Sequence, residues 1–235
     1  MSLTAQQFNI SSLEIAIFSN KDNELSPTKI LGTVLGEFQS RYDGEVQSLP
    51  LPVEAPSEIP RITMISSNNE YRLHCATSRI DSFWYNIGKQ YELKEITENV
   101  AQPLSKLITN LNLSIGRYAL VIERTIEVEK AAEYLADKFC DEGIRKGPIK
   151  RSDSFEIHNH KKFDLRLSKD NSIKVNSWVR CKNIVSNYGK EMIWVQQDIN
   201  TLHEVLPSKK FSNQDFVSFY KAATKEAESI MSLYF

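Results

Sequence analysis

A carboxylate and two imidazoles lie close together in the sequence and have the chemistry of a metal site. In FEIHNH, Glu156, His158 and His160 occupy every second position. On a strand these three side chains share one face, and carboxylate and imidazole groups bind divalent transition metals. Alternate residues of a strand are ~6.5–7 Å apart, which is wide for one ion, and the polar residues around them favour a turn. A metal-dependent hydrolase is therefore the weakest of the functions that we consider.

A basic loop offers a second kind of chemistry, the binding of phosphate or of an acidic protein segment. RKGPIKR, residues 145 to 151, is the densest positive patch in the chain. It places Arg145, Lys146, Lys150 and Arg151 around a Gly-Pro turn. Such cations hold phosphates and steer charged partners, although no aromatic residue is interleaved for base stacking. We predict a partner-binding or phosphate-binding loop, with a solvated turn as the alternative.

No catalytic signature accompanies these clusters. His74 and Cys75 are adjacent, so on a strand they point to opposite faces and cannot act as base and nucleophile. The chain has no GxSxG, HExxH, P-loop or GxGxxG motif, and its 8 glycines leave little material for a phosphate-cradling loop. We therefore assign no catalytic residue, expect no cofactor and predict a non-enzymatic protein.

The composition is that of an ordinary globular chain. The 235 residues carry 29 basic and 30 acidic side chains, so no global field draws the protein to nucleic acid or to an anionic membrane. The 3 cysteines are widely spaced within apolar patterns, which favours free thiols and a cytoplasmic location. No apolar run approaches the ~20 residues of a membrane helix, so we expect no membrane contact.

Hydrophobic periodicity divides the chain into two similar series of elements. The first series begins with the alternating strand LEIAIF and continues with a helix that opens at Ser26 and Pro27. The second begins at RYALVIERTI and ends in a helix opened by a capping box of Ser212 and Asp215. The expected strands are 13–18, 61–66, 71–77, 79–87, 117–126, 155–158, 163–168, 172–185 and 192–199, and the expected helices are 27–42, 95–112, 129–140 and 212–234.

The matching order predicts an internal duplication. Residues 1–113 and 114–235 each follow strand, helix, three or four strands, helix, which predicts an α+β protein of two related β-α-β(3-4)-α units. Their antiparallel sheets, with helices packed on one face, are expected to form one pseudo-symmetric body. This order resembles that of TATA-box-binding-protein-like and helix-grip folds, an analogy of fold that says nothing about function.

The stretch from residue 71 to 91 is expected to form the interior of the first sheet. Trp84 falls within a strand there, and Tyr85 and Tyr91 leave the strand towards the next helix, where they are expected to line a groove between sheet and helix. Arg117 joins this groove if it stacks on Trp84 or pairs with Asp81. We therefore predict Tyr85, Tyr91 and Arg117 as groove residues.

The same stretch carries a resemblance. An apolar strand with Trp84, a following Tyr91 and a later strand opening Gly-Arg117-Tyr118 are similar to a family of uncharacterised, sporadically distributed prokaryotic proteins of about this length. The later strand of that family is Gly-Leu-Arg-Tyr-Ile-Asn-like, and here Arg117 and Tyr118 match while the next two residues differ. The resemblance covers residues 8 to 235. It implies carriage in mobile, defence or toxin-antitoxin loci, and it implies no activity.

These observations predict a binding or accessory protein of a defence or toxin-antitoxin system that acts by occupying a protein partner. The alternative is a protein that holds a small ligand or nucleotide in a pocket between helix and sheet. Nucleic acid at the basic loop and a homo-oligomer are further alternatives. Four prolines between residues 50 and 60 guard one sheet edge, so the edge formed from residues 144–162 is the one expected to receive a partner.

Overall fold

The computed structural model describes residues 3–20, 25–52, 54–145, 153–202 and 210–235, without the side chains of residues 144 and 145. The elements of the first half are η1 (Ala5–Gln7), β1 (Asn9–Ser19), α1 (Pro27–Phe38), β2 (Val46–Ser48), β3 (Ile62–Ile65), β4 (Tyr71–Cys75), β5 (Arg79–Tyr85) and α2 (Leu93–Asn110). Those of the second half are β6 (Ile115–Glu127), α3 (Ala131–Phe139), α4 (Glu142–Arg145), β7 (Glu156–Arg166), β8 (Ser172–Val185), β9 (Glu191–Thr201) and α5 (Asn213–Tyr234).

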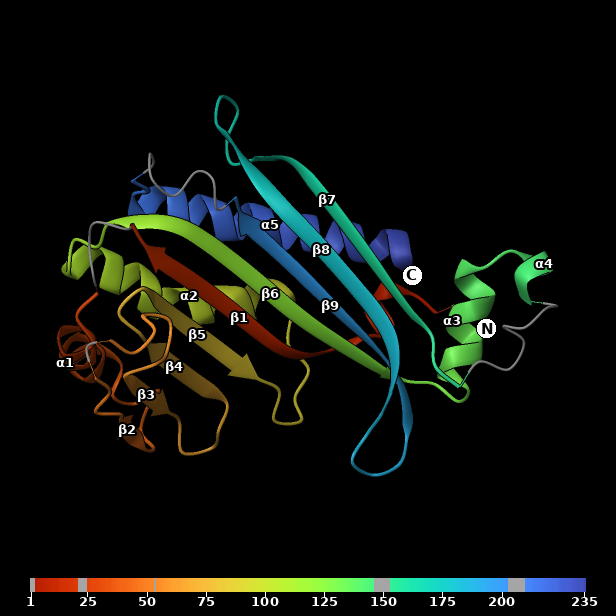
Figure 1. Cartoon of the computed structure of the whole chain (residues 1–235), viewed down its shortest axis with the longest axis horizontal. Helices are drawn as coiled ribbons and strands as arrows, with labels where there is room; N and C mark the ends of the chain where they lie inside the picture. Colours follow the sequence, from red (N-terminus) through yellow and green to blue (C-terminus); the bar gives the residue numbers. More distant parts are fainter. Residues whose placement is uncertain (1–2, 21–24, 53, 146–152, 203–209) are drawn as a thin grey trace.

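The nine strands of the described residues form one antiparallel sheet in the order β2-β3-β4-β5-β1-β6-β9-β8-β7 (Figure 1). At its centre β1 pairs with β6, with Leu13 opposite Ile122 and Ile15 opposite Leu120. These four residues are buried, whereas Glu14 and Val121 between them are only partly buried, so each of the two strands turns one apolar face to the core. The α+β class and the antiparallel sheet predicted from the sequence are confirmed.

The two halves of the sheet have the same strand order from the centre outwards. In the first half β5 lies beside β1 and is followed by β4 and β3, while in the second half β9 lies beside β6 and is followed by β8 and β7. The first half has one additional strand, β2, at its outer edge. Each half is therefore a meander whose last strand returns to pair with its first.

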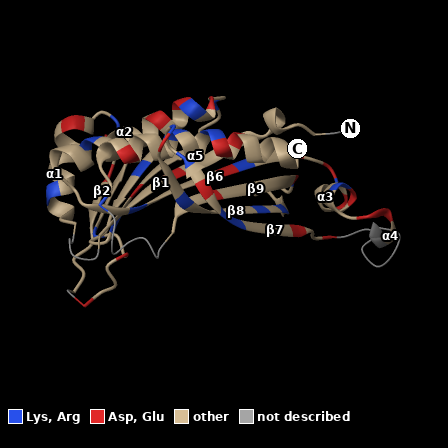
Figure 2. Cartoon of the chain, turned by 90° about the horizontal axis from the view of Figure 1, so that it is seen from above, with Lys and Arg blue, Asp and Glu red and all other residues tan. Residues whose placement is uncertain are grey.

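The long helices cover one face of this sheet (Figure 2). α2 packs on β1 and β5, α5 packs on β6, β7 and β9, and α3 packs on β8 and β9. Leu104 of α2 and Phe219 of α5 are fully buried in the core that these layers enclose. No described helix covers the opposite face, which we call the open face.

Two local predictions need correction. FEIH and FDLRLS do not form separate strands, because β7 pairs with β8 without a break from Glu156 to Arg166. The polar residues between them do not turn the chain: Lys161 lies at the rim of the sheet and reaches Glu226 of α5 at 3.4 Å.

The first helix ends at Phe38 instead of Tyr42. After it the chain passes so close to β3 that a Cβ on Gly44 would lie 2.7 Å from the Ile65 carbonyl oxygen.

Other local signals hold. Pro27 is the first residue of α1, and the Ser212–Asp215 capping box opens α5 with reciprocal bonds of 3.2 and 2.8 Å. Pro103 lies inside α2 instead of opening it. β2 is a three-residue edge strand followed by the prolines, and β7 is the opposite edge, as expected.

All three cysteines are free thiols. Within the described ranges, none of the helices has the length and apolar character needed to cross a bilayer.

Candidate binding surface on the open face

The second half of the open face combines aromatic, basic and amide side chains. Along β8 and β9 the residues that face the helices, such as Val179 and Val195, are buried, and the residues between them are only partly buried. The strand register places these partly buried residues side by side. They are Asn176, Trp178, Arg180 and Lys182 on β8 and Trp194, Gln196 and Asp198 on β9. The exposed His158, His160 and Lys162 of β7 and the buried Asn200 of β9 lie in the same rows.

Two indoles form the aromatic part of this surface. The rings of His160 and Trp178 are parallel to within 10° with centroids 4.0 Å apart. The Arg180 guanidinium lies 5.9 Å from the Trp178 ring, and the Lys182 ammonium lies 4.9 Å from the Trp194 ring. We call these five residues the tryptophan platform. It offers flat π surfaces, each with a cation within 6 Å of the ring centroid. This combination stacks planar groups and neutralises anions.

Hydrogen bonds hold the platform in place. Arg180 donates to Gln196 at 2.9 Å, and Gln196 donates to Glu123 at 3.0 Å. Asn176 donates to Asn200 at 3.2 Å, and Asn200 donates to Asp198 at 2.8 Å. Because each amide is oriented by a neighbour, the platform and the row of donors and acceptors beside it are preorganised. Preorganised polar groups lower the entropy lost when a ligand binds.

The centre of the open face is acidic instead. Arg79 contacts both Glu14, at 3.1 Å, and Asp81, at 2.5 Å. Burial raises the pKa of Glu14 to about 7, and the charge of Asp81 adds to this effect while Arg79 opposes it. Burial also raises the pKa of Asp81. A partly buried carboxyl group, Glu14, and a buried one, Asp81, share one guanidinium here, so this part of the face repels phosphate when both are ionised.

Strands β4 and β5 of the first half carry a smaller aromatic group on the open face. His74 lies 4.9 Å from Phe83, and Arg72 lies 5.5 Å from Tyr85, measured to ring centroids. Burial, together with the charges of Arg72 and Arg79, lowers the pKa of His74 to about 4. This imidazole is neutral near pH 7, and the carboxylates of the centre lie beside the group. The platform on β7 to β9 is therefore the stronger candidate for an anionic partner.

The predicted groove residues do not lie together. Tyr85 is on the open face, whereas Tyr91 lies on the helix-covered side, where it meets the edge of Trp84 at 5.4 Å and donates to Glu70 at 3.1 Å. Arg117 is on the open face, 4.8 Å from the Phe18 ring. It bonds the Thr201 carbonyl at 3.1 Å instead of stacking on Trp84.

The predicted pairing of Asp81 is also different, because its partner is Arg79 and not Arg117. The two arginines flank Phe18 and come from different strands, β5 and β6. The strand register decides which of them reaches the carboxylate. Sequence reasoning had no means of choosing between them, because both stand at the start of an apolar strand.

Glu156, His158 and His160 share one face, as predicted, but they do not converge. His158 donates to Glu156 at 2.7 Å, and this bond holds the pKa of Glu156 below its usual range. His160 instead bonds the Asn176 side chain at 3.2 Å and stacks on Trp178. Within the described residues, no three His, Cys, Asp or Glu side chains are placed to share a metal ion.

The basic loop lies almost wholly outside the described residues. Lys146, Lys150 and Arg151 are not described, and Arg145 is described only as the last backbone position of α4. The loop immediately precedes β7 in sequence, so the chain that leaves it enters the strand carrying His158 and His160. Its role as a phosphate-binding or partner-binding site stays a prediction.

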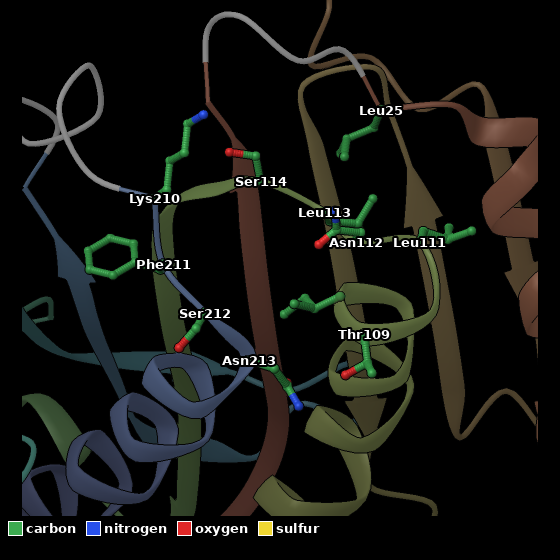
Figure 3. Close-up of a pocket in the computed structure, with 11 residues that line it drawn as sticks. Leu25, Thr109, Leu111, Asn112, Leu113, Ser114, Lys210, Phe211, Ser212 and Asn213 are labelled. Carbon is green, nitrogen blue, oxygen red and sulfur yellow. The ribbon is translucent and has the colours of Figure 1, made fainter.

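A cavity of about 750 Å³ lies between the end of α2 and the start of α5 (Figure 3). Leu111, Leu113 and Phe211 form part of its apolar lining. Leu25 and Lys210 also line it, and each directly follows a segment that is not described. Because its walls are incompletely described, we base no function on this cavity.

Sequence reasoning missed the platform, although a signal was present. In SIKVNSWVRCKNIV, the alternate residues Lys174, Asn176, Trp178, Arg180 and Lys182 are all polar or aromatic, while those between them are apolar or small. This period of two indicates a strand with one buried face and one face of cations and indole. Taken alone, each tryptophan is equally typical of a core and of a sheet face.

Comparisons with known proteins add little. No family model matches the chain, and no curated protein sequence matches it. Among solved structures, one similar chain is the di-domain ARO/CYC StfQ from the steffimycin biosynthetic pathway. It is 9% identical, the match covers 94% of this chain and 95% of that chain, and the TM-score is 0.22. A score this low carries no argument about fold or function.

Proposed function

We propose that the protein is a non-enzymatic binding protein that holds single-stranded nucleic acid on the tryptophan platform. The observation that carries the proposal is the pair of partly buried indoles, Trp178 and Trp194, with cations beside their rings on a sheet face that no described helix covers. Stacking of bases on aromatic side chains is worth about 1–3 kcal/mol per base and needs no particular sequence. A base can extend the His160–Trp178 stack or take the place of Lys182 over Trp194.

The charges around the platform support this occupant. On the open face of β7 and β8, Lys162, Lys174, Arg180 and Lys182 outnumber Glu156 and Asp164, although the whole chain has a net charge of -1. The basic segment of residues 145–151, which precedes β7 in the sequence, adds four further cations. A nucleic-acid backbone along β8 therefore meets the most positive part of a nearly neutral protein.

A single strand suits this surface better than a duplex. The platform is a flat sheet face, and it offers ring faces for stacking next to the amides Asn176, Gln196 and Asn200. Bases paired in a duplex expose neither their ring faces nor their Watson–Crick edges, whereas an unpaired strand exposes both. RNA and DNA share this chemistry, so both are tested below.

We expect labelled RNA and DNA strands of about 12 nucleotides to bind the protein. In the variant Trp178→Ala/Trp194→Ala their affinity should fall at least tenfold, because each lost indole removes about 1–3 kcal/mol of stacking. Fluorescence anisotropy measures this directly. Tyr188→Ala is the matched control, since it removes an exposed aromatic ring from the turn between β8 and β9. The proposal fails if wild-type protein binds neither strand more tightly than about 100 μM, or if the double variant binds as wild type does.

Reversal of the four charges Arg145, Lys146, Lys150 and Arg151 to Glu should weaken nucleic-acid binding and flatten its salt dependence. Single-stranded nucleic acid releases about 0.7 counterions per phosphate contact, so the slope of log K against log salt should shrink by up to about 3. The melting temperature should stay nearly unchanged, as is usual for surface substitutions. Unchanged affinity and slope would mean that the loop is only a solvated turn, while the platform prediction would stand.

A protein partner is the second candidate, and the edge strand β7 is the observation that favours it. β7 is 11 residues long and pairs with β8 alone among the described strands, so an extended protein segment can add a strand beside it. Mass spectrometry of proteins that co-purify tests this candidate. The double tryptophan variant separates the two, because it should lose nucleic acid and keep a partner bound at the edge.

The broader predictions are also proposals at this point. We infer that the two halves derive from one β-α-β(3-4)-α unit with an order of the TATA-box-binding-protein-like or helix-grip kind, which the matching strand order supports. A role in a defence or toxin-antitoxin system and a cytoplasmic location rest on the resemblance and on the cysteine pattern. The genes beside that of this protein would test the role.

A further inference from the structure

A second candidate site lies on the other side of the sheet from the platform, among the helices. A cavity of about 520 Å³ opens between η1, the start of α2 and the second half of α5. Its apolar wall includes Phe8, Ile10, Leu93 and Met231, and the side chain of Arg124 from β6 also lines it. An adjoining cavity of about 300 Å³ shares Phe8 and Ile10 and extends to Trp84. Small-molecule sites occupy about 300–1,000 Å³, so the space is adequate.

Arg124 is the unusual member of this wall. It is only 4% exposed, and its one hydrogen bond within the described residues goes to the side-chain oxygen of Gln197. Gln197 in turn donates to the Ala227 carbonyl at 2.8 Å, so it is a neutral and already oriented partner. No described carboxylate forms an ion pair with Arg124. Burial lowers the pKa of the guanidinium to about 10, and the charge of Glu228 only partly offsets this.

A buried guanidinium without a counter-ion is costly, because its lost hydration is not replaced. Planar guanidinium groups bind carboxylates through two parallel hydrogen bonds, and four of the five N–H donors of Arg124 bond no group among the described residues. The free backbone N–H groups at the start of α2 add partial positive charge at the cavity wall, and the N-cap residue Glu92 makes no side-chain bond to them. Both features favour an anion at this wall.

We propose that this cavity binds a small amphipathic carboxylate, whose head group pairs with Arg124 and whose apolar body lies along Phe8, Ile10 and Leu93. A monoanion fits better than a phosphate ester. Two cations, Arg124 and Lys94, and two carboxylates, Glu92 and Glu228, line the cavity, so a second negative charge on the ligand would meet no further cation. The site is separate from the tryptophan platform, so either proposal can fail alone.

The test compares decanoate with decanol, which share an apolar chain and differ in charge, by isothermal titration calorimetry. Wild-type protein should bind decanoate at least tenfold more tightly than decanol. Arg124→Met should lose this preference and keep the weak binding of decanol, while Arg124→Lys should keep part of it. Arg166→Met is the matched control, since it removes an exposed arginine at the far end of β7 and should change neither affinity.

Two outcomes would overturn the proposal. One is wild-type protein that binds decanoate no better than decanol, a comparison that needs no variant. The other is folded Arg124→Met protein that still prefers decanoate. Circular dichroism establishes folding of the variant. We expect it to fold, because replacing a buried unpaired charge with an apolar side chain is often neutral or stabilising.

Discussion

Replacement of Trp84 by Ala is expected to lower the free energy of unfolding by about 3–5 kcal/mol. The indole is 1% exposed and is among the largest fully buried side chains of the described core. Its Nε1–H donates to the carboxylate of Glu70 at 3.0 Å, and Tyr91 contacts both groups. The substitution therefore leaves a cavity and also removes a donor from a carboxylate that is only 8% exposed.

Trp84→Phe separates these two effects. Phenylalanine retains much of the ring volume but lacks the N–H, while Tyr91 still donates to Glu70. The loss should therefore be about 1.5–3 kcal/mol, the usual contribution of one hydrogen bond to a charged group. Trp194→Ala, on the open face, is the matched control and should cost less than about 1 kcal/mol. Urea denaturation of the three variants measures the differences. If Trp84→Ala is no more destabilising than Trp194→Ala, burial of Trp84 in the core does not stabilise the fold as predicted.

Replacement of Glu14 by Gln is expected to stabilise the protein above neutral pH. The folded-state pKa of Glu14, about 7, exceeds the ordinary value of 4.5. Between pH 4.5 and 7 the folded state therefore binds more protons than the unfolded state, and this carboxyl makes stability fall as pH rises through that window. Each unit of pKa shift corresponds to about 1.4 kcal/mol. Because the side chain is 26% exposed, we expect a gain of about 2 kcal/mol at pH 8.

The pH dependence of the difference between variant and wild type is the diagnostic measurement. The gain should be present at pH 8, shrink as pH falls through 7 and vanish below about 4.5, where Glu14 is protonated in both states. Arg79 is in contact with Glu14, but it is shared with Asp81, so its attraction does not offset the burial. A gain that is constant with pH would contradict the prediction, because it would mean that folding does not raise the pKa of Glu14.

The sequence by itself determined the local elements. Alternation in LEIAIF and in RYALVIERTI predicted the later part of β1 and most of β6, because a strand with one buried face must repeat every two residues. The Ser212–Asp215 pair located the start of α5, because a capping box is formed by residues three apart. The order of these elements was sufficient for the α+β class. It also indicated which edge of the sheet is short and rich in proline.

Only the tertiary structure decided which side chains meet. Tyr85 and Tyr91 are six positions apart but lie on opposite sides of the sheet. Tyr85 is the last residue of β5, whereas Tyr91 belongs to the loop between β5 and α2. The continuity of β7 depends on its unbroken pairing with β8, which outweighs local turn preference. Arg124 and Gln197 are 73 residues apart. Contacts of this kind depend on strand register and helix coverage, which nearby residues do not encode.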